Sequence, residues 1–365
     1  MSECQKESIH RNECFFFLFC YLLQVSNNRI PKPTTASAIV IKNTLDFCLL
    51  FQRYMSIIKS KLLNGVCMKV GASNCCLIHN YGEGKSIELL AKAGFDSIDY
   101  SFNSCDLLND KKLFATASDE EFDAYFMNVK KILDKNNIVV GQTHAITGGF
   151  NVTTSQEYFD ITVRCIRATQ ILGCEYTVIH PIILPSYKYD QNKDECKKIN
   201  MAFFTKLIPY LTKYNVKNAF ENMWNWDEKA NKICPTVCSR PEEIIDYIET
   251  LGSDRFVACL DLGHIELTAD TGDTVFGAII KLKKYLKLVH IHDNDGKSDL
   301  HLPPFFGKIN WQAVAKAFKE ANYDGILNFE VEEGYFEKFG KDNLQPCANY
   351  LAQSGRFLSA LIKNS

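Results

Sequence analysis

A dense group of potential metal ligands lies in the last third of the chain. Residues 288–301 (LVHIHDNDGKSDLH) hold three histidines and three aspartates, directly after apolar residues typical of a buried strand. Imidazole and carboxylate groups together suit zinc, manganese, iron or cobalt, and a strand that ends in them aims its ligands at one point. The alternative is a polar loop with unrelated histidines. Matching residues elsewhere in the chain favour the metal site.

Strand-like and helix-like segments alternate from Met68 to the C-terminus, which indicates β/α units around a parallel sheet. The eight strand-like runs are residues 69–73, 97–102, 138–144, 176–181, 218–221, 256–261, 286–292 and 326–331. Helix-like segments include residues 85–93, 119–133, 156–172, 201–214, 241–251 and 311–321. Eight such units predict an α/β fold of the (β/α)8 TIM barrel type, with residues 68–365 as a single domain. A doubly wound open sheet is the alternative, but ligands on so many strands favour closure.

Polar residues that could bind a metal or a substrate recur at the C-terminal ends of these runs, where barrel enzymes build their active sites. Six of the eight histidines in the chain fall there, His292 included. The full set is His144, His180, Glu221, Asp261, His264, His290, Asp299, His301 and Glu330. His292 is two residues beyond His290 but outside this set, because we expect it to point away from the site and to have a structural role.

Each of these residues alone has a simpler interpretation. A glutamate such as Glu221 or Glu330 can pair with a neighbouring lysine, and Asp261 can cap a helix. However, both glutamates follow apolar residues, in the sequences AFE and NFE. An unpaired carboxylate in such a place is costly, and a divalent cation removes that cost. Together the residues therefore predict a metal site at the mouth of the barrel.

Residues 1–67 form a poorly patterned N-terminal extension. The apolar run at residues 14–25 (CFFFLFCYLLQV) is too short to span a bilayer and follows acidic rather than basic residues. We therefore expect no stable membrane insertion. Met68 is expected to be the native start, with the extension as a non-native or disordered segment. A signal peptide and an amphipathic anchor are the alternatives.

Composition excludes some classes of function. The net charge is −2, the pI is about 6.5 and no long basic block is present, which disfavours nucleic acid as a partner. No G-x-G-x-x-G or P-loop motif follows a strand, so nothing indicates a dinucleotide or a P-loop nucleotide. Fifteen cysteines without the compact spacing of a disulfide scaffold indicate free thiols and a cytoplasmic location.

Five motifs give the chain a resemblance to a known family. They are residues 219–223 (AFENM), 259–264 (CLDLGH), 289–295 (VHIHDND), 299–311 (DLHLPPFFGKINW) and 323–330 (YDGILNFE). In order and spacing they resemble the xylose isomerase-like barrel superfamily over residues 68–365. This group holds sugar phosphate isomerases and epimerases together with endonuclease IV. In its epimerases one divalent metal is held by a Glu, Asp, His and Glu set, and the resemblance places these ligands at Glu221, Asp261, His290 and Glu330.

The resemblance implies a sugar or sugar-phosphate isomerase or epimerase that depends on manganese, zinc, cobalt or magnesium. Glu221 and Glu330 would transfer the proton as base and acid through a metal-stabilised enediolate. His144, His180, His264 and Trp224 would bind the small-molecule sugar substrate. The chain departs from the family at Lys297, near which an arginine often contacts substrate, so ketohexose specificity does not transfer. The oligomeric state stays open, a homo-oligomer included.

Endonuclease IV provides the main alternative. The resemblance would place its additional metal ligands at His144, His180, His264, Asp299 and His301, all of which are present. A metal-dependent phosphodiesterase acting on abasic DNA is therefore the second hypothesis, although the net negative charge disfavours it. A hydrolase, dehydratase or lyase using the same metal, or a non-catalytic binding module, is a further alternative. One bound metal would favour the epimerase, and two or three would favour the hydrolytic cluster.

Overall fold

The computed structural model describes residues 68–148, 155–184, 192–269, 272–331, 335–336 and 340–365. The expectations for residues 1–67 lie outside these residues. The strands are β1 (Val70–Ser73), β2 (Ser97–Ser101), β3 (Val139–His144), β4 (Tyr176–Val178), β5 (Lys217–Glu221), β6 (Trp224–Asp227), β7 (Lys232–Pro235), β8 (Phe256–Asp261), β9 (Leu286–His290) and β10 (Leu327–Phe329).

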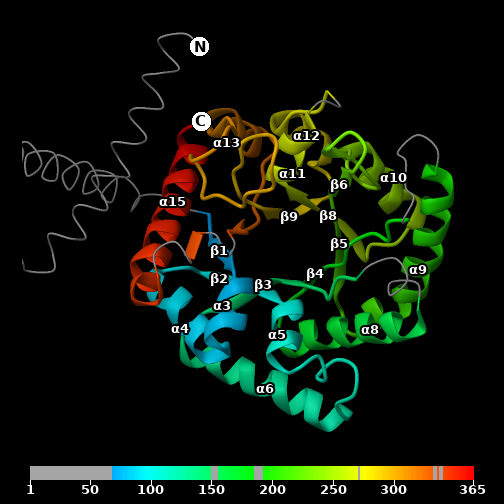
Figure 1. The fold of residues 1–365 in the computed structure, drawn as a ribbon, viewed down its shortest axis with the longest axis vertical. Helices are drawn as coiled ribbons and strands as arrows, with labels where there is room; N and C mark the ends of the chain where they lie inside the picture. The colour runs from blue at the N-terminus through cyan, green and yellow to red at the C-terminus, as the bar shows by residue number, and fades with distance from the viewer. Residues whose placement is uncertain (1–67, 149–154, 185–191, 270–271, 332–334, 337–339) are drawn as a thin grey trace, which may run out of the picture. The chain divides into compact units, whose positions relative to one another are not determined.

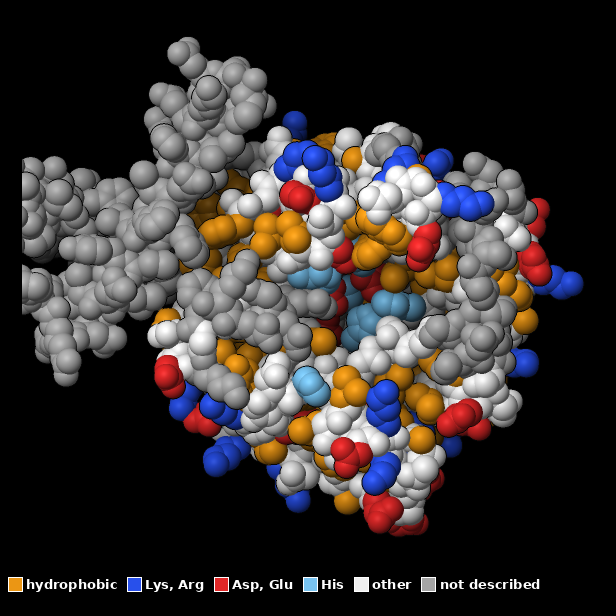
Figure 2. Space-filling model, viewed as in Figure 1, with side chains coloured by type: hydrophobic (Ala, Val, Ile, Leu, Met, Phe, Trp, Pro, Cys, Tyr) orange, Lys and Arg blue, Asp and Glu red, His pale blue; other side chains and the backbone are white. Residues whose placement is uncertain are grey.

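Eight parallel strands form the predicted barrel. Their order is β10-β1-β2-β3-β4-β5-β8-β9, and a parallel bridge between Ile291 and Phe329 links the two ends of the sheet. Helices surround the strands (Figure 1), so the (β/α)8 TIM barrel expected from the sequence is confirmed. In a space-filling view from the same direction as Figure 1, histidine and acidic side chains gather in a hollow at the centre of the barrel (Figure 2).

The predicted helices are all present, with small changes at their ends. They are α4 (Glu83–Ala93), α6 (Asp119–Lys135), α8 (Gln156–Ile171), α9 (Lys193–Lys213), α10 (Pro241–Leu251) and α13 (Trp311–Glu320). The largest difference is that α9 starts at Lys193 instead of residue 201. Its first turns are mostly polar and charged, so they carry little of the apolar periodicity on which the prediction depends.

Several other elements were not predicted. They are α3 (Cys75–Tyr81), α5 (Phe102–Leu108), α11 (Leu262–Leu267), α12 (Val275–Leu282), α15 (Leu344–Asn364), the short 3-10 helix η2 (Lys341–Asn343) and the antiparallel β6–β7 hairpin. The first three have six or seven residues each, which is too short for a clear helical period. The hairpin lies in the connection between β5 and α10, beside the barrel mouth.

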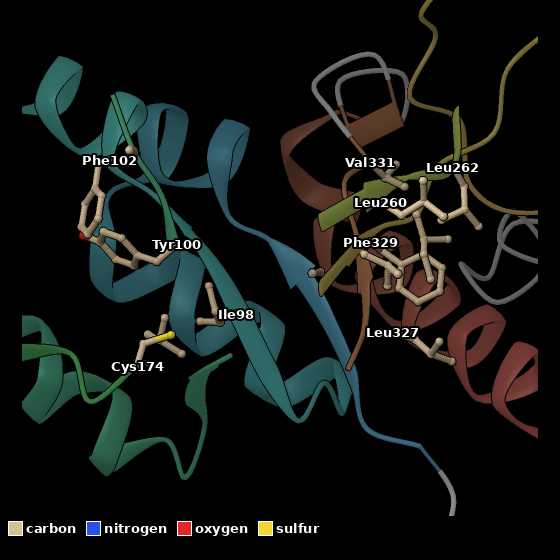
Figure 3. Packing of buried hydrophobic residues seen from close by; sticks show 14 of the residues in the cluster. Ile98, Tyr100, Phe102, Cys174, Leu260, Leu262, Leu327, Phe329 and Val331 are labelled. Atoms are coloured by element: carbon tan, nitrogen blue, oxygen red, sulfur yellow. The ribbon is translucent and has the colours of Figure 1, made fainter. Parts of the chain in front are cut away.

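The core lies mainly between the strands and the surrounding helices. On β2, Ile98 and Tyr100 are fully buried, and Tyr100 packs against Phe102 with 5.5 Å between ring centroids. Figure 3 shows this part of the core together with Phe329 of β10, which belongs to the same cluster. Helix α15 covers β1 and β10 at close range, because a Cβ at Gly355 would lie 2.4 Å from Val70 Cγ1. The C-terminal helix therefore belongs to the barrel itself.

Two further observations concern the described residues. Cys105, Cys165 and Cys259 are buried free thiols, as the cysteine usage predicts. Among the helices of the described residues, none combines the length and the apolar character that a membrane crossing requires.

We predict that a chain starting at Met68 folds as well as the full chain. The barrel strands and their covering helices all lie in residues after Met68. The melting temperature and the circular dichroism spectrum of the shortened chain should match those of the full chain. Failure of the shortened chain to fold would contradict the proposed domain boundary, and stable vesicle binding by the full chain alone would support an anchor.

Candidate metal centre

The sequence-predicted site residues converge in three adjoining groups. In each group, the potential ligand atoms all lie within 4.8 Å of one another. The central group is Glu221, Asp261, His290 and Glu330. A second group is His144, His180 and Glu221, and a third is His264, His292, Asp299 and His301. The carboxylate of Glu221 belongs to the central and second groups, and His292 Nε2 of the third group lies 3.0 Å from Asp261 Oδ1 of the central one, so the three groups adjoin.

The central group is built from the ends of three strands and the residue after a fourth. Glu221, Asp261 and His290 are the last residues of β5, β8 and β9, and Glu330 directly follows β10. His290 Nδ1 lies 2.9 Å from Glu221 Oε1, 3.4 Å from Glu330 Oε2 and 4.0 Å from Asp261 Oδ2. Two buried carboxylates and one half-buried carboxylate around one imidazole repel one another unless a cation lies among them. The donor set of this group therefore fits a divalent metal.

The protonation of the central group shows the same need for a cation. Burial alone would lower the pKa of His290, but the surrounding acidic groups hold it well above its usual value. Burial would raise the pKa of Glu221, yet the imidazoles of His290, His144 and His180 hold it well below its usual range. Burial raises the pKa of Glu330. In the metal-free protein a proton on His290 thus supplies the positive charge that a metal would replace.

Three histidines are oriented by backbone carbonyls. Nδ1 of His144 lies 3.0 Å from the Ala145 carbonyl oxygen, and Nδ1 of His264 lies 2.8 Å from that of Asn222. Nδ1 of His301 is 2.8 Å from the Glu330 carbonyl oxygen. Because a carbonyl only accepts, each Nδ1 carries a proton, and each neutral ring keeps its lone pair on Nε2. This arrangement is typical of histidines that bind a metal through Nε2.

In the third group these lone pairs face a carboxylate. Nε2 of His301 lies 3.2 Å and Nε2 of His264 lies 3.5 Å from Asp299 Oδ2. A lone pair opposite a carboxylate oxygen is repulsive unless a proton or a metal lies between them. Burial would lower the pKa of His264, but Asp261 and Asp299 raise it to about 10. The group therefore favours a positive charge beside Asp299, either a proton on His264 or a metal ion.

The second group lies beside the central one. His180 Nε2 is 3.0 Å from Glu221 Oε2 and 3.0 Å from His144 Nε2. His144 Nε2 is 3.6 Å from the same oxygen of Glu221. The His180 side chain is 26% exposed, more than any other member of the three groups, so it also borders the solvent-accessible part of the centre. Both histidines can therefore contact either a metal or a substrate.

Two residues that were not predicted hold the ligands in place. Asn222 pairs with the backbone of Asp261 in both directions, at 2.7 and 2.9 Å. Asp99 Oδ2 on β2 lies 3.2 Å from His290 Nε2 and accepts hydrogen bonds from Gln142 and Asn328. Asp99 therefore favours a proton on Nε2 of His290 and leaves Nδ1 of the same ring for the metal. The signal for Asp99 was a lone acid inside an otherwise uncharged buried strand, SIDYS.

Two aromatic residues, Trp224 and Phe305, lie in the segments that follow β5 and β9. Trp224, predicted to contact substrate, donates a hydrogen bond from Nε1 to Asp299 Oδ2 at 3.0 Å and thereby links the β6–β7 hairpin to the third group. Phe305 has a φ of 77°, in the region that favours glycine. It packs against Trp311, with 5.5 Å between ring centroids.

The expectation that His292 points away from the site is wrong. Its side chain is fully buried, and its Nε2 lies 3.0 Å from Asp261 Oδ1. The expectation does not follow from strand geometry, because residues two apart along a strand, such as His290 and His292, point to the same face.

Comparison with known proteins agrees with this architecture. The family model described as xylose isomerase-like TIM barrel matches residues 87–355. The chain belongs to this family. A relative in Methanocaldococcus jannaschii, an uncharacterised protein, is 24% identical over 271 residues, which are 72% of this chain and 83% of the relative. An uncharacterised protein of Sinorhizobium fredii is 41% identical over 82 residues, 22% of this chain and 24% of that protein.

Solved structures of this family share the fold. A D-tagatose 3-epimerase-like protein superposes with a TM-score of 0.59 at 19% identity, over 82% of this chain and 100% of that one. D-psicose 3-epimerase, solved in the presence of D-fructose, superposes with a TM-score of 0.60 at 16% identity, over 80% of this chain and 99% of that one. The IolI protein with a bound zinc atom superposes with a TM-score of 0.58 at 17% identity, over 81% of this chain and 99% of that one. At such identities the likeness concerns the barrel alone.

We predict that Asp261→Asn and His290→Ala lower both metal content and thermal stability. A metal that binds only the folded protein adds its binding free energy to folding, so loss of a ligand reduces both. Mass spectrometry for metals and thermal melts test this. Asp295→Asn, in the same ligand-rich loop but exposed, is the matched control. If the two ligand variants keep full metal and unchanged melting, the ligand assignment is wrong.

We also predict that metal binding at pH 7 releases protons. His264, with a pKa of about 10, and His290, with a pKa well above its usual value, are protonated in the metal-free protein. A metal displaces those protons, so apparent affinity should fall as the pH is lowered. Titration of metal-free protein with zinc in weakly buffered indicator solution measures the release. Binding without proton release would contradict this description of the centre.

Proposed function

We propose that the protein is a divalent-metal-dependent isomerase or epimerase of a small sugar or sugar derivative. The observation that carries the proposal is the pair Glu221 and Glu330. These carboxylates approach the same nitrogen, His290 Nδ1, from two different strands. Their environments shift their pKa values in opposite directions. Two carboxyl groups whose pKa values are shifted apart in this way are suited to act as base and acid on one substrate.

The proton transfer follows from these positions. Glu221, whose pKa is low, is ionised and can take the proton from the carbon next to a substrate carbonyl. Glu330, whose pKa is raised, can hold a proton and deliver one to the opposite face or to the adjacent carbon. A divalent metal in the central group would supply Lewis-acid stabilisation of the negative charge that develops on substrate oxygens. Delivery of a proton to the opposite face of the same carbon gives an epimer, and delivery to the neighbouring carbon gives an isomer.

Other residues of the centre would bind and orient the substrate. The side chains of His144 and His180 are 13% and 26% exposed, so their nitrogens can reach substrate hydroxyl groups. His264 is more deeply buried and is aimed at Asp299. Trp224 offers its ring beside His264, at 6.4 Å between centroids. Aromatic and polar groups in a small hollow are commonly used to cover a sugar face and fix its hydroxyls.

The comparisons support this class of reaction without establishing it. Among the structures that share the fold, two are a D-tagatose 3-epimerase-like protein and D-psicose 3-epimerase, and one contains zinc. Those names describe the other proteins, and a barrel alone does not determine the reaction. The transfer of the activity to this chain rests on the two glutamates and the ligand set around them.

One observation favours a second candidate function. The three adjoining ligand groups could hold two or three metals, with Glu221 shared between two of them. Such a cluster is suited to hydrolysis of a phosphodiester, including the one at an abasic site in DNA. The net charge of −2 disfavours a nucleic-acid substrate, because phosphate contacts normally supply much of the affinity. Hydrolysis therefore remains the second proposal.

We predict that Glu221→Gln and Glu330→Gln each abolish proton exchange on an active sugar. Glutamine keeps the shape of the side chain but cannot accept the proton, so the loss should be about 10²-fold or more. The measurement is deuterium incorporation from solvent at the carbon next to the carbonyl, across a panel of ketoses, sugar phosphates and cyclitol ketones. Glu266→Gln, on α11 and outside the three groups, is the control. Exchange at full rate in either active-site variant would contradict the mechanism.

A further prediction separates the two candidate functions. If a single metal in the central group performs the chemistry, His144→Ala and Asp299→Ala should reduce proton exchange far less than the glutamate changes do. Assays of abasic-site DNA cleavage on the same proteins provide the comparison. If the wild type cleaves that DNA, exchanges no sugar proton and loses cleavage equally in all four variants, the isomerase proposal fails and the hydrolase stands.

A further inference from the structure

His292 differs from the other histidines of the centre in what its ring nitrogens contact. His144, His264 and His301 each place Nδ1 against a backbone carbonyl. Nδ1 of His292 is buried and has no hydrogen-bond partner among the described residues. Its Nε2 instead lies 3.0 and 3.1 Å from the two carboxylate oxygens of Asp261. The proton of His292 is therefore expected on Nε2, where a metal-binding histidine of this centre would keep its lone pair.

Ring geometry also argues against His292 as a metal ligand of the third group. Its ring stacks on that of His301, with 4.0 Å between centroids and 9° between planes. A metal binds imidazole close to the ring plane, along the nitrogen lone pair. Two stacked, nearly parallel planes do not meet at one ion, so His292 and His301 cannot both bind the same metal well. Nε2 of His301 faces Asp299, and so His301 is the better ligand.

We propose that His292 is a positioning residue that donates its Nε2 hydrogen to the Asp261 carboxylate and so fixes the orientation of this metal ligand. This inference rests on the proposed function, because it takes Asp261 as a metal ligand. Asp261 Oδ1 already accepts the backbone N–H of His264 at 2.7 Å. His292 Nε2 lies close to both oxygens and forms its hydrogen bond with Oδ2, so the carboxylate is held between the His264 backbone and the His292 ring, with Oδ2 4.0 Å from His290 Nδ1.

The surroundings hold the His292 ring in this position. A Cβ at Gly263 would lie 2.0 to 2.5 Å from three atoms of the ring, so the ring fills the space that any other residue at 263 would need. His301 covers the ring through the stacked contact. His292 is fully buried, so water does not compete for its hydrogen bond to Asp261. Outer groups that hold a metal ligand in this way typically contribute 10- to 100-fold to metal affinity.

The test compares three substitutions in the full-length protein. His292→Gln places an amide N–H near the position of Nε2, His292→Asn places it near Nδ1, and His292→Ala removes the donor. Binding of manganese(II) alone is measured from the electron paramagnetic resonance signal of the free ion. Asp261→Asn, measured in parallel, identifies the binding step that belongs to the central group. Circular dichroism and thermal melts monitor the fold of each variant.

We expect the alanine and asparagine variants to bind manganese at that step about 10- to 100-fold more weakly, and the glutamine variant to remain close to wild type. Rescue by glutamine alone is a result that general damage to packing would not give. Wild-type affinity in all three variants, or the same loss of affinity in all three, overturns the inference. If the wild type itself binds no manganese, the proposed function fails first, which distinguishes the two failures.

A second measurement needs neither metal nor substitution. Nitrogen-15 NMR of histidine side chains in the metal-free protein reports which ring nitrogen carries the proton. We expect the His292 signal to show Nε2 protonated, whereas those of His144 and His301 show a proton on Nδ1. A His292 ring protonated on Nδ1 alone would overturn the inference even if every variant unfolded.

Discussion

The need to neutralise buried carboxylates is the constraint on which the rest of this structure depends. Glu221, Asp261, Asp299 and Glu330 lie together at the mouth of the barrel, and the first two are almost completely buried. Such a concentration of negative charge away from water is unstable unless protons or metal ions balance it. The imidazoles provide that balance in the metal-free protein, and their available nitrogens make the same places suitable for divalent metals.

The barrel brings these groups to one level. Asp261 and His290 are register partners on neighbouring parallel strands, so the two ligands leave the sheet at the same height. His144 is likewise opposite Val178, the last residue of β4, two residues before His180. Backbone carbonyls and Asp99 then determine which nitrogen of each ring faces the centre. Fold and protonation state thus act together, since the strands set position and the hydrogen bonds set the direction of each lone pair.

Much of this could be read from the sequence because the relevant signals are local. Strand-like runs with His144, Glu221, Asp261 and Glu330 at or near their C-terminal ends predict both the barrel and the convergence of the side chains. The β6–β7 hairpin and the short helices could not be predicted, because they carry no apolar period. The roles of Asp99 and His292 depend on contacts between strands. For His292 the expectation was wrong although the spacing was visible in the sequence, because residues two apart in a strand share a face.

The central claim is that the centre binds divalent metal through Glu221, Asp261, His290 and Glu330. Anomalous X-ray diffraction at the metal absorption edge, from crystals of the full chain loaded with manganese or zinc, tests this claim most directly. The account predicts a strong peak about 2.0–2.3 Å from ligand atoms of all four residues, with any further peaks in the two adjoining groups. No peak among these four residues after loading, or peaks only elsewhere on the protein, would contradict it.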